Sequence, residues 1–175
     1  MAKKKSKKNS QIDSLITLLS VLLGIVAIIM LFVPSIAVVD SDTTYKGLDV
    51  VFGLKENKAL VGEVVYFEFS FMNLLTYVLV AVGVLFTILA YLGKGSKFAT
   101  LIATVAFIVS AVFFFLQIAY CIPGKGIEDL VSGIGSLFGE DASVKDSLEL
   151  GTGAIVGGIC SALAGVASGY KLLTK

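Results

Sequence analysis

Long uncharged apolar runs dominate the hydrophobic pattern of this 175-residue chain. Each run is long enough to cross a hydrocarbon core of about 30 Å as a helix that rises about 1.5 Å per residue. The pattern predicts transmembrane helices at residues 11–34, 71–92, 98–121 and 151–171. The predicted fold is therefore an all-α membrane protein, built as a four-transmembrane-helix bundle that forms one integrated domain.

The remaining segments are two tails, one short turn and two long loops. Residues 1–10 form a polylysine tail that we expect to be disordered. Residues 93–97 are too few to do more than reverse the chain, which makes the second and third helices an antiparallel hairpin. Residues 35–70 and 122–150 are the long loops, and residues 172–175 form the second tail.

Charge divides these segments by sign. The tails, the helix ends next to them and the short turn hold nine lysines and a single acidic residue, Asp13, whereas the long loops hold five lysines and twelve acidic residues. Cationic flanks stay in the cytoplasm, so we predict a multi-pass protein of the plasma membrane with both termini cytoplasmic and both long loops extracellular. All fourteen basic residues are lysine, which is typical of AT-rich genomes and indicates a bacterial source.

A cleaved signal peptide is the alternative interpretation of the first apolar run. The lysine-rich start and the sequence Ser35-Ile36-Ala37 resemble a signal peptide with a small-x-small cleavage site. The apolar run of about nineteen residues is longer than the usual signal core, and this favours a retained helix.

The first long loop has the composition of strands. Val65, Phe67, Phe69 and Phe71 alternate with polar positions, which is the period of a strand with one buried face. We predict a small antiparallel sheet that rests on the helix ends, because an isolated hairpin is marginal in water. Its strands are expected within Ser35–Val39, Gly47–Leu54 and Ala59–Phe71, with a turn at Lys55–Lys58.

The second long loop has the period of a helix. Its apolar positions recur at helical spacing, with Glu128, Asp129 and Ser132 between them. This pattern predicts an amphipathic helix at the membrane surface or across the end of the bundle. The apolar positions are Ile127, Leu130, Val131, Ile134, Leu137 and Phe138.

Small residues form a ridge along the fourth predicted helix. Gly153, Gly157, Ser161, Gly165 and Gly169 recur every four residues, which lets another helix approach closely. The partner is either a helix of the same bundle or a second copy, in a homo-oligomer or a thin-walled pore. The run Gly151–Gly157 imitates a dinucleotide-binding pattern, but it lies inside a membrane span and lacks the strand that this motif requires.

Little in the composition suggests catalysis. The chain has no histidine, the commonest general base and metal ligand, and no ionisable side chain lies at the middle of a predicted span. We therefore predict a protein that is not an enzyme, with no catalytic, cofactor-binding or metal site. Cys121 and Cys160 differ in predicted depth by about 13 Å, too far for a disulfide.

The lysine-rich start has two interpretations. It is either a topology signal alone or a cationic segment that lies on anionic lipid headgroups. We expect the bilayer as a partner and no nucleic acid. The lysines concerned are Lys3, Lys4, Lys5, Lys7 and Lys8.

Two functions fit these features. The first is a structural or interaction role, in which the extracellular loops are presented to a protein partner. The alternative is a small channel, pore or transporter subunit that oligomerises through the glycine-rich fourth helix.

The layout resembles that of claudin-type tetraspan proteins: both termini inside, a long strand-rich first outer loop, a tight inner turn and a shorter second outer loop. This resemblance is one of topology. The first loop of claudins carries a Trp, a Gly-Leu-Trp and a cysteine pair, whereas this chain has no tryptophan and its first long loop, with Gly47-Leu48, has no cysteine. No residue role follows from the resemblance.

Overall fold

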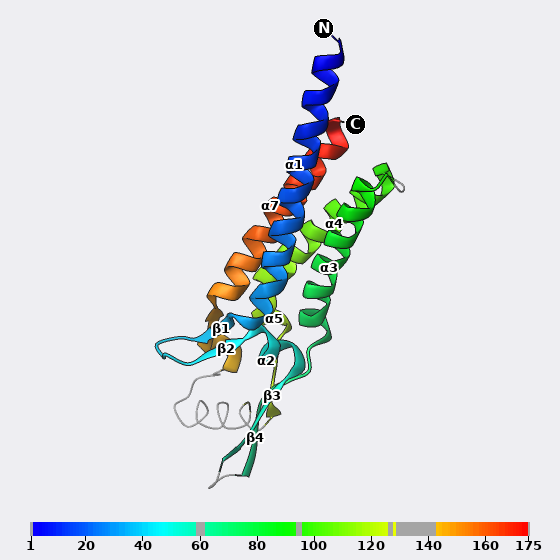
Figure 1. Cartoon of the computed structure of the whole chain (residues 1–175). Helices are drawn as coiled ribbons and strands as arrows, with labels where there is room; N and C mark the ends of the chain where they lie inside the picture. The colour runs from blue at the N-terminus through cyan, green and yellow to red at the C-terminus, as the bar shows by residue number, and fades with distance from the viewer. Residues whose placement is uncertain (1, 59–61, 94–95, 126–127, 129–142, 175) are drawn as a thin grey trace. The chain divides into compact units, whose positions relative to one another are not determined.

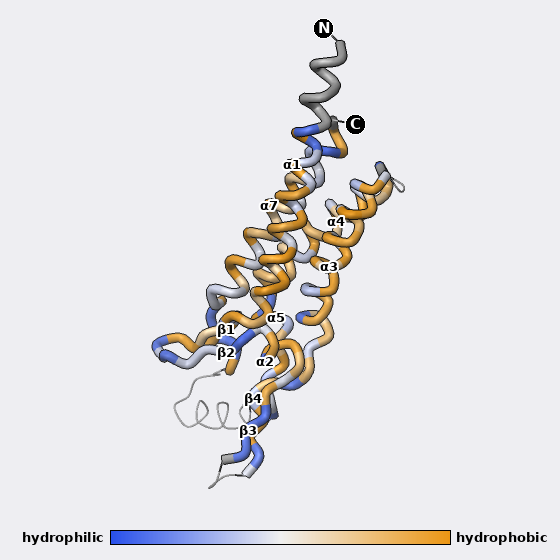
Figure 2. Tube along the Cα trace, viewed as in Figure 1, coloured by the Kyte–Doolittle hydropathy of each residue, from blue (hydrophilic) through white to orange (hydrophobic). Residues whose placement is uncertain are grey.

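The computed structural model describes residues 2–58, 62–93, 96–125, 128 and 143–174. Four long apolar helices are present in these residues, as predicted (Figure 1). They are α1 (Ala2–Ile29), α3 (Phe71–Tyr91), α4 (Ser96–Phe115) and α7 (Thr152–Thr174). Hydrophobic residues cover most of their length (Figure 2). The stretches long and apolar enough to cross a membrane are Gln11–Phe32, Phe71–Tyr91, Lys97–Phe115 and Thr152–Leu173.

The chain divides into two compact units, and each contains segments from distant parts of the sequence. Unit 1 comprises Met1–Ile29, Thr76–Val112 and Gly157–Lys175. Unit 2 comprises Met30–Leu75 and Phe113–Val156. Unit 1 is therefore made of helical segments, and unit 2 contains the strands together with short helical segments.

Unit 1 is a helix bundle packed around Phe107 of α4, which is completely buried. Glycines from three other helices face this side chain. The ring and Cβ of Phe107 occupy the space that a side chain on each of these glycines would need. A Cβ added to Gly83 of α3 would lie 2.9 Å from the Phe107 ring, and one on Gly24 of α1 would lie 3.1 Å from it. On α7, a Cβ at Gly165 would lie 3.3 Å from Phe107 Cβ. Close approach at glycine is a common way for apolar helices to pack in lipid.

Unit 2 contains two antiparallel three-stranded sheets. One has the strand order β2-β1-β6 and the other has the order β3-β4-β5. Each combines strands from both long loops, whereas the sequence predicted a sheet in the first loop alone. The strands are β1 (Pro34–Val38), β2 (Thr44–Lys46), β3 (Leu54–Lys58), β4 (Gly62–Glu68), β5 (Ile122–Pro123) and β6 (Leu148–Leu150).

A hydrophobic core of its own holds unit 2 together. Ile36 of β1 and Phe67 of β4 are buried with Val50 and Cys121, so the core joins both sheets. The ring of Tyr45 on β2 meets the ring of Phe67 edge to face, with centroids 4.8 Å apart, a favoured aromatic geometry. The two sheets therefore belong to one folded body.

The prediction of a strand at Gly47–Leu54 was wrong, because this segment forms the short helix α2 (Gly47–Phe52). The Asp49 carboxylate accepts a hydrogen bond from the backbone N–H of Lys46 at 3.0 Å. An acidic side chain in the first turn stabilises a helix start in this way. Gly53 ends the helix with φ +88°, a left-handed conformation that favours glycine.

The prediction of a turn at Lys55–Lys58 was also wrong, because these residues belong to β3 and pair with β4. The polar composition that suggested a turn has another cause: β3 lies at the edge of its sheet. Charged residues are common on edge strands because they discourage pairing with other chains.

Three further helical segments differ from the predictions or lie outside them. The helix α1 begins at Ala2, where a disordered tail was expected; lysine is a good helix former, and extending an existing helix needs no new nucleus. The third apolar helix ends at Phe115, before the short α5 (Gln117–Tyr120), instead of continuing to Cys121. The predicted amphipathic helix at Ile127–Phe138 falls almost entirely outside the described residues.

Two 3-10 turns complete the described elements. The first, η1 (Met30–Phe32), follows α1 directly, and Pro34 comes two residues later. A proline disfavours helical geometry in the residue before it, and the helical stretch ends at Phe32, before the predicted end at residue 34. The second is η2 (Val144–Ser147), just before β6.

Candidate functional site

Unit 2 contains a cluster of buried polar side chains. Ser35 donates a hydrogen bond through Oγ to Gln117 Oε1. Asn73 donates through Nδ2 to the backbone carbonyl of Gln117 at 3.3 Å. Ser70 donates through Oγ to the carbonyl of Tyr120 at 2.7 Å, and the backbone N–H of Asn73 donates to Ser70 Oγ at 3.3 Å.

This cluster has a structural role. Ser35, Ser70, Asn73 and Gln117 are each at most 1% exposed, so a solute has no access to them. Their bonds connect β1, α5 and the start of α3 and so help to specify one arrangement, while Asn73 Oδ1 is buried without a hydrogen-bond partner. No local pattern in the sequence indicates that Asn73 and Gln117 meet.

The surface of unit 2 carries a groove with exposed aromatic rings, called here the aromatic groove. Phe52 and Phe69 are 56% and 50% exposed, and their ring centroids lie 6.5 Å apart. The groove has a volume of about 490 Å³. It is lined by Phe52, Gly53, Lys55, Val65, Phe67, Glu68 and Phe69.

Charges of both signs border the aromatic groove. Lys55 lies on β3 and Glu68 at the end of β4, and both are exposed. Lys55 also forms an ion pair with Glu63 at 3.3 Å. An exposed aromatic pair with charged residues at its rim is the usual composition of a protein-binding surface.

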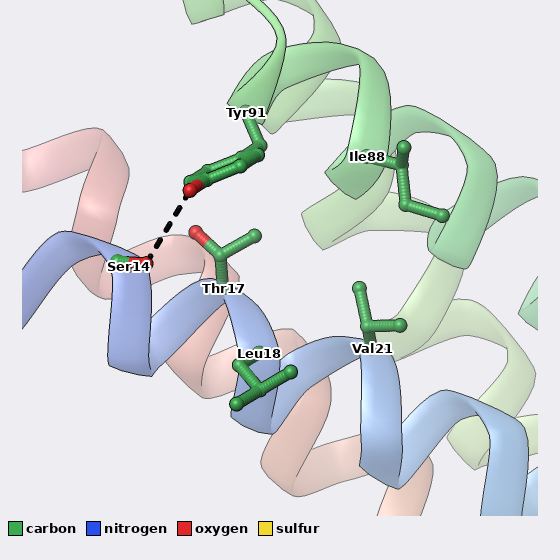
Figure 3. Close-up of a pocket in the computed structure, with 6 residues that line it drawn as sticks. All are labelled: Ser14, Thr17, Leu18, Val21, Ile88 and Tyr91. Carbon is green, nitrogen blue, oxygen red and sulfur yellow. Dashed lines mark hydrogen bonds between the residues drawn. The ribbon is translucent and has the colours of Figure 1, made fainter.

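Unit 1 contains a second hollow, called here the α1–α3 pocket, with a volume of about 240 Å³ (Figure 3). Across it, Ser14 Oγ of α1 lies 3.5 Å from the phenolic oxygen of Tyr91 of α3. Figure 3 shows the Thr17 side chain beside this pair. The pocket is lined by Ser14, Thr17, Leu18, Val21, Ile88 and Tyr91.

A buried cation lies directly behind the wall of the α1–α3 pocket. Lys171 of α7 is 4% exposed, and its ammonium group donates to the hydroxyl of Thr17. The Thr17 hydroxyl donates in turn to the backbone carbonyl of Asp13 at 2.7 Å. Thr17 therefore connects the pocket with the positive charge at the end of α7.

The predicted glycine ridge of α7 faces other segments of the same chain. Ser161 Oγ lies 2.6 Å from Ser110 Oγ of α4. A Cβ on Gly165 would lie 3.0 Å from the Ile108 side chain, and one on Gly169 would lie 3.4 Å from Thr104. In unit 2, a Cβ on Gly153 would lie 2.8 Å from the carbonyl oxygen of Pro34.

The remaining predicted site residues carry less information. Gly157 is buried in α7. The backbone of Lys3–Lys8 lies in α1. Cys121 and Cys160 are free thiols. In the described part of the chain, no group of three or more histidine, cysteine or acidic residues has the placement of a metal site.

Comparison with protein-family models, with curated proteins and with solved structures finds no match for this chain. Evidence on function therefore comes from the geometry of the two units.

Residues that line the aromatic groove or lie behind the α1–α3 pocket were not singled out as a site by the sequence. Phe52 lies in a segment that looked like a strand, and its exposure depends on the α2 helix that replaces that strand. Lys171 looked like an ordinary cytoplasmic lysine, and only the packing of α7 against α1 reveals that its ammonium group is buried. Tyr91 was identifiable as an aromatic residue at a helix end, which is a common position for interfacial tyrosine.

Proposed function

We propose that this chain is a multi-pass membrane protein that presents unit 2 to a protein partner outside the cell. Its role is structural or interactive, and it is not an enzyme. Four apolar helices support residence in a membrane. The excess of lysine in the tails and short turn supports cytoplasmic termini under the positive-inside rule.

The observation that carries this proposal is the aromatic groove on a separately cored unit. Loops that only connect helices need no hydrophobic core, yet unit 2 has two sheets around Ile36 and Phe67. Such a core fixes the position of surface side chains, which reduces the entropy lost when a partner binds. Phe52 and Phe69 supply exposed aromatic surface on that rigid support.

The expected partner surface is a protein segment with an apolar side chain for the groove. Lys55 and Glu68 at the rim favour a partner that carries charges of both signs near that side chain. The charged edge strand β3 makes strand addition at that edge of the sheet unfavourable, which favours the groove as the contact.

Site-specific photo-crosslinking in intact cells tests this proposal. A benzophenone amino acid is placed at Phe69 and, separately, at Phe52. The matched control is Phe98 of α4, an exposed phenylalanine in unit 1. We expect a discrete protein adduct of the same mass from positions 69 and 52 and none from position 98.

Two outcomes contradict the proposal. If positions 69 and 52 react only with lipid, the aromatic groove is a membrane contact. If all three positions give the same protein adducts, the contact is not specific to the groove.

The alternative of a channel, pore or transporter subunit gains no separate support from the described contacts, because Ser161 and Gly165 face α4 of the same chain. Solute flux in liposomes is its direct test.

A further inference from the structure

The α1–α3 pocket is polar at the end nearer the lysine-rich start of α1 and apolar at the opposite end. Ser14 and Thr17 are followed along α1 by Leu18 and Val21, which lie further from the lysine-rich start of the helix. On α3, Tyr91 is the last residue and Ile88 lies one turn earlier. This gradient matches an amphipathic molecule whose polar headgroup lies beside Ser14 and Tyr91 and whose apolar chain lies between α1 and α3.

One cation, Lys171, lies beside the polar end of the pocket. Lys171 is buried and bonded to the Thr17 hydroxyl, which lines the pocket. A charge this close to a site of low dielectric constant exerts a strong attraction on an anion. Lysine side chains near the ends of membrane helices usually extend toward the interface, whereas Lys171 is 4% exposed and bonded to Thr17.

Two other grooves on unit 1 lack these features. The groove between α1 and α7 is lined by apolar residues and Tyr170, and the groove between α3 and α4 is lined by apolar residues alone. Their volumes of about 380 and 330 Å³ exceed that of the α1–α3 pocket. Size alone therefore does not single out the α1–α3 pocket; its three hydroxyl groups, on Ser14, Thr17 and Tyr91, and the neighbouring cation do.

We propose that the α1–α3 pocket binds one anionic phospholipid. The headgroup phosphate accepts hydrogen bonds from Ser14 and Tyr91 and is attracted by Lys171, while an acyl chain packs against Leu18, Val21 and Ile88. Asp13, one residue before Ser14, is the acidic residue nearest in sequence and opposes the phosphate charge. The inference requires that the helices lie in a membrane, and it is independent of any partner at unit 2.

Native mass spectrometry of the full chain in mild detergent tests the proposal. The probes are phosphatidylglycerol and phosphatidylcholine with identical acyl chains. We expect the first bound lipid to be phosphatidylglycerol, with a preference that falls about fivefold in Lys171→Met, the effect of one basic residue near a headgroup. Lys97→Met is the matched control, because Lys97 is exposed at the start of α4; it should keep the preference, and Asp13→Asn should keep or increase it.

A second variant addresses the acyl chain and does not depend on the folding of Lys171→Met. Leu18 is 56% exposed, so Leu18→Trp fills the pocket without disturbing the core. We expect this variant to lose the first bound phosphatidylglycerol, whereas Leu101→Trp, in the α3–α4 groove, keeps it.

Three results would overturn the proposal. The first is equal binding of the two lipids by the unmodified chain. The second is a preference that survives both Lys171→Met and Leu18→Trp, which would place the headgroup on other lysines. The third is displacement of phosphatidylglycerol by millimolar inorganic phosphate, which would make the site one for free phosphate. A failure to find crosslinks at Phe69 would count against the proposed partner at unit 2 but would not change the lipid-binding results. The two proposals can therefore fail independently.

Discussion

Gly83 of α3 lies against the ring of Phe107 of α4, so closely that a Cβ on Gly83 would stand 2.9 Å from two ring carbons. Real Cβ atoms essentially never come this close to a neighbour. The absence of a side chain at Gly83 therefore lets the ring occupy the interior of unit 1. Gly24 and Gly165 provide the same accommodation from α1 and α7.

Replacement of Phe107 by alanine should strongly destabilise the bundle. The ring is fully buried, and Phe→Ala in a packed core costs about 3–5 kcal/mol. The matched control is Phe98→Ala on the same helix, where the ring is 70% exposed and the loss should stay below about 1 kcal/mol. Thermal unfolding of both variants in the same detergent measures the difference. Equal losses of unfolding free energy in the two variants would contradict the conclusion that the bundle packs around Phe107.

The sequence predicted only part of this packing. The ridge on α7 was recognisable because its small residues recur every four positions. Gly24 and Gly83 are single glycines on their helix faces, so no period marks them. Nothing local distinguishes Phe107 from the other eleven phenylalanines, because burial of one ring depends on three helices from distant parts of the chain.

Gly165→Leu should lower stability without changing the mass of the protein in detergent. A Cβ there would lie 3.0 Å from Ile108 and 3.3 Å from Phe107 Cβ, and overpacking of this kind costs about 1–3 kcal/mol. Light scattering and thermal unfolding of the same samples separate the two effects. Val166→Leu is the matched control, because Val166 is the next residue on α7 and its side chain is exposed. Gly62→Leu in unit 2 would not serve as a control, because the positive φ of Gly62 strains any side chain placed there.

The opposite result would revive the oligomer interpretation of the ridge. If Gly165→Leu converts a discrete oligomer into a monomer and keeps its melting temperature, the ridge contacts a second copy.

Unit 2 shows where local patterns are insufficient. Alternation around Val65 and Phe67 correctly predicted β4, but Phe69 and Phe71, predicted on the same buried face, lie beyond the end of the strand and are exposed. The apolar run at Val50 and Val51 is equally compatible with a strand or a short buried helix, and the hydrogen bond from Lys46 N–H to Asp49 stabilises the helix. The strands β5 and β6 are two and three residues long. They exist because distant segments pair with them, which a local pattern does not reveal.

Gln117→Ala should destabilise unit 2 by about 1–3 kcal/mol. The change leaves the buried Ser35 hydroxyl without the acceptor that it now uses, and an unsatisfied buried polar group costs about this much. The bond from Asn73 to the backbone carbonyl of Gln117 does not depend on the side chain. Accessibility of Cys121, buried in the unit 2 core, provides the measurement when Cys160 is replaced by alanine. Gln11→Ala, at an exposed position of α1, is the control.

Double substitution refines this test. Ser35→Ala with Gln117→Ala removes both partners, so it should cost less than the sum of the two single changes. Strict additivity would mean that the Ser35–Gln117 bond contributes nothing.

The reactivity of Cys121 should depend on pH in a way that reports its surroundings. Cys121 lies beyond the apolar stretch Lys97–Phe115. Burial raises the pKa of its thiol, and the positive charge of Lys145 lowers that pKa by a smaller amount. Because the thiolate is the reactive form, a raised pKa lowers the alkylation rate below that of an ordinary thiol at the same pH. The rate should then rise with pH through and beyond the ordinary pKa range of cysteine.

Lys145→Met should move this profile to still higher pH, since it removes the charge that favours the thiolate. Iodoacetamide labelling of the folded Cys160→Ala protein between pH 7 and pH 10 (about the range in which cysteine titrates) measures the shift. Lys125→Met is the matched control, because Lys125 is exposed and does not contribute to the pKa shift of Cys121. Faster labelling of Lys145→Met at every pH would show instead that Lys145 closes the site sterically, through its hydrogen bond to the carbonyl of Ala119 at 2.9 Å.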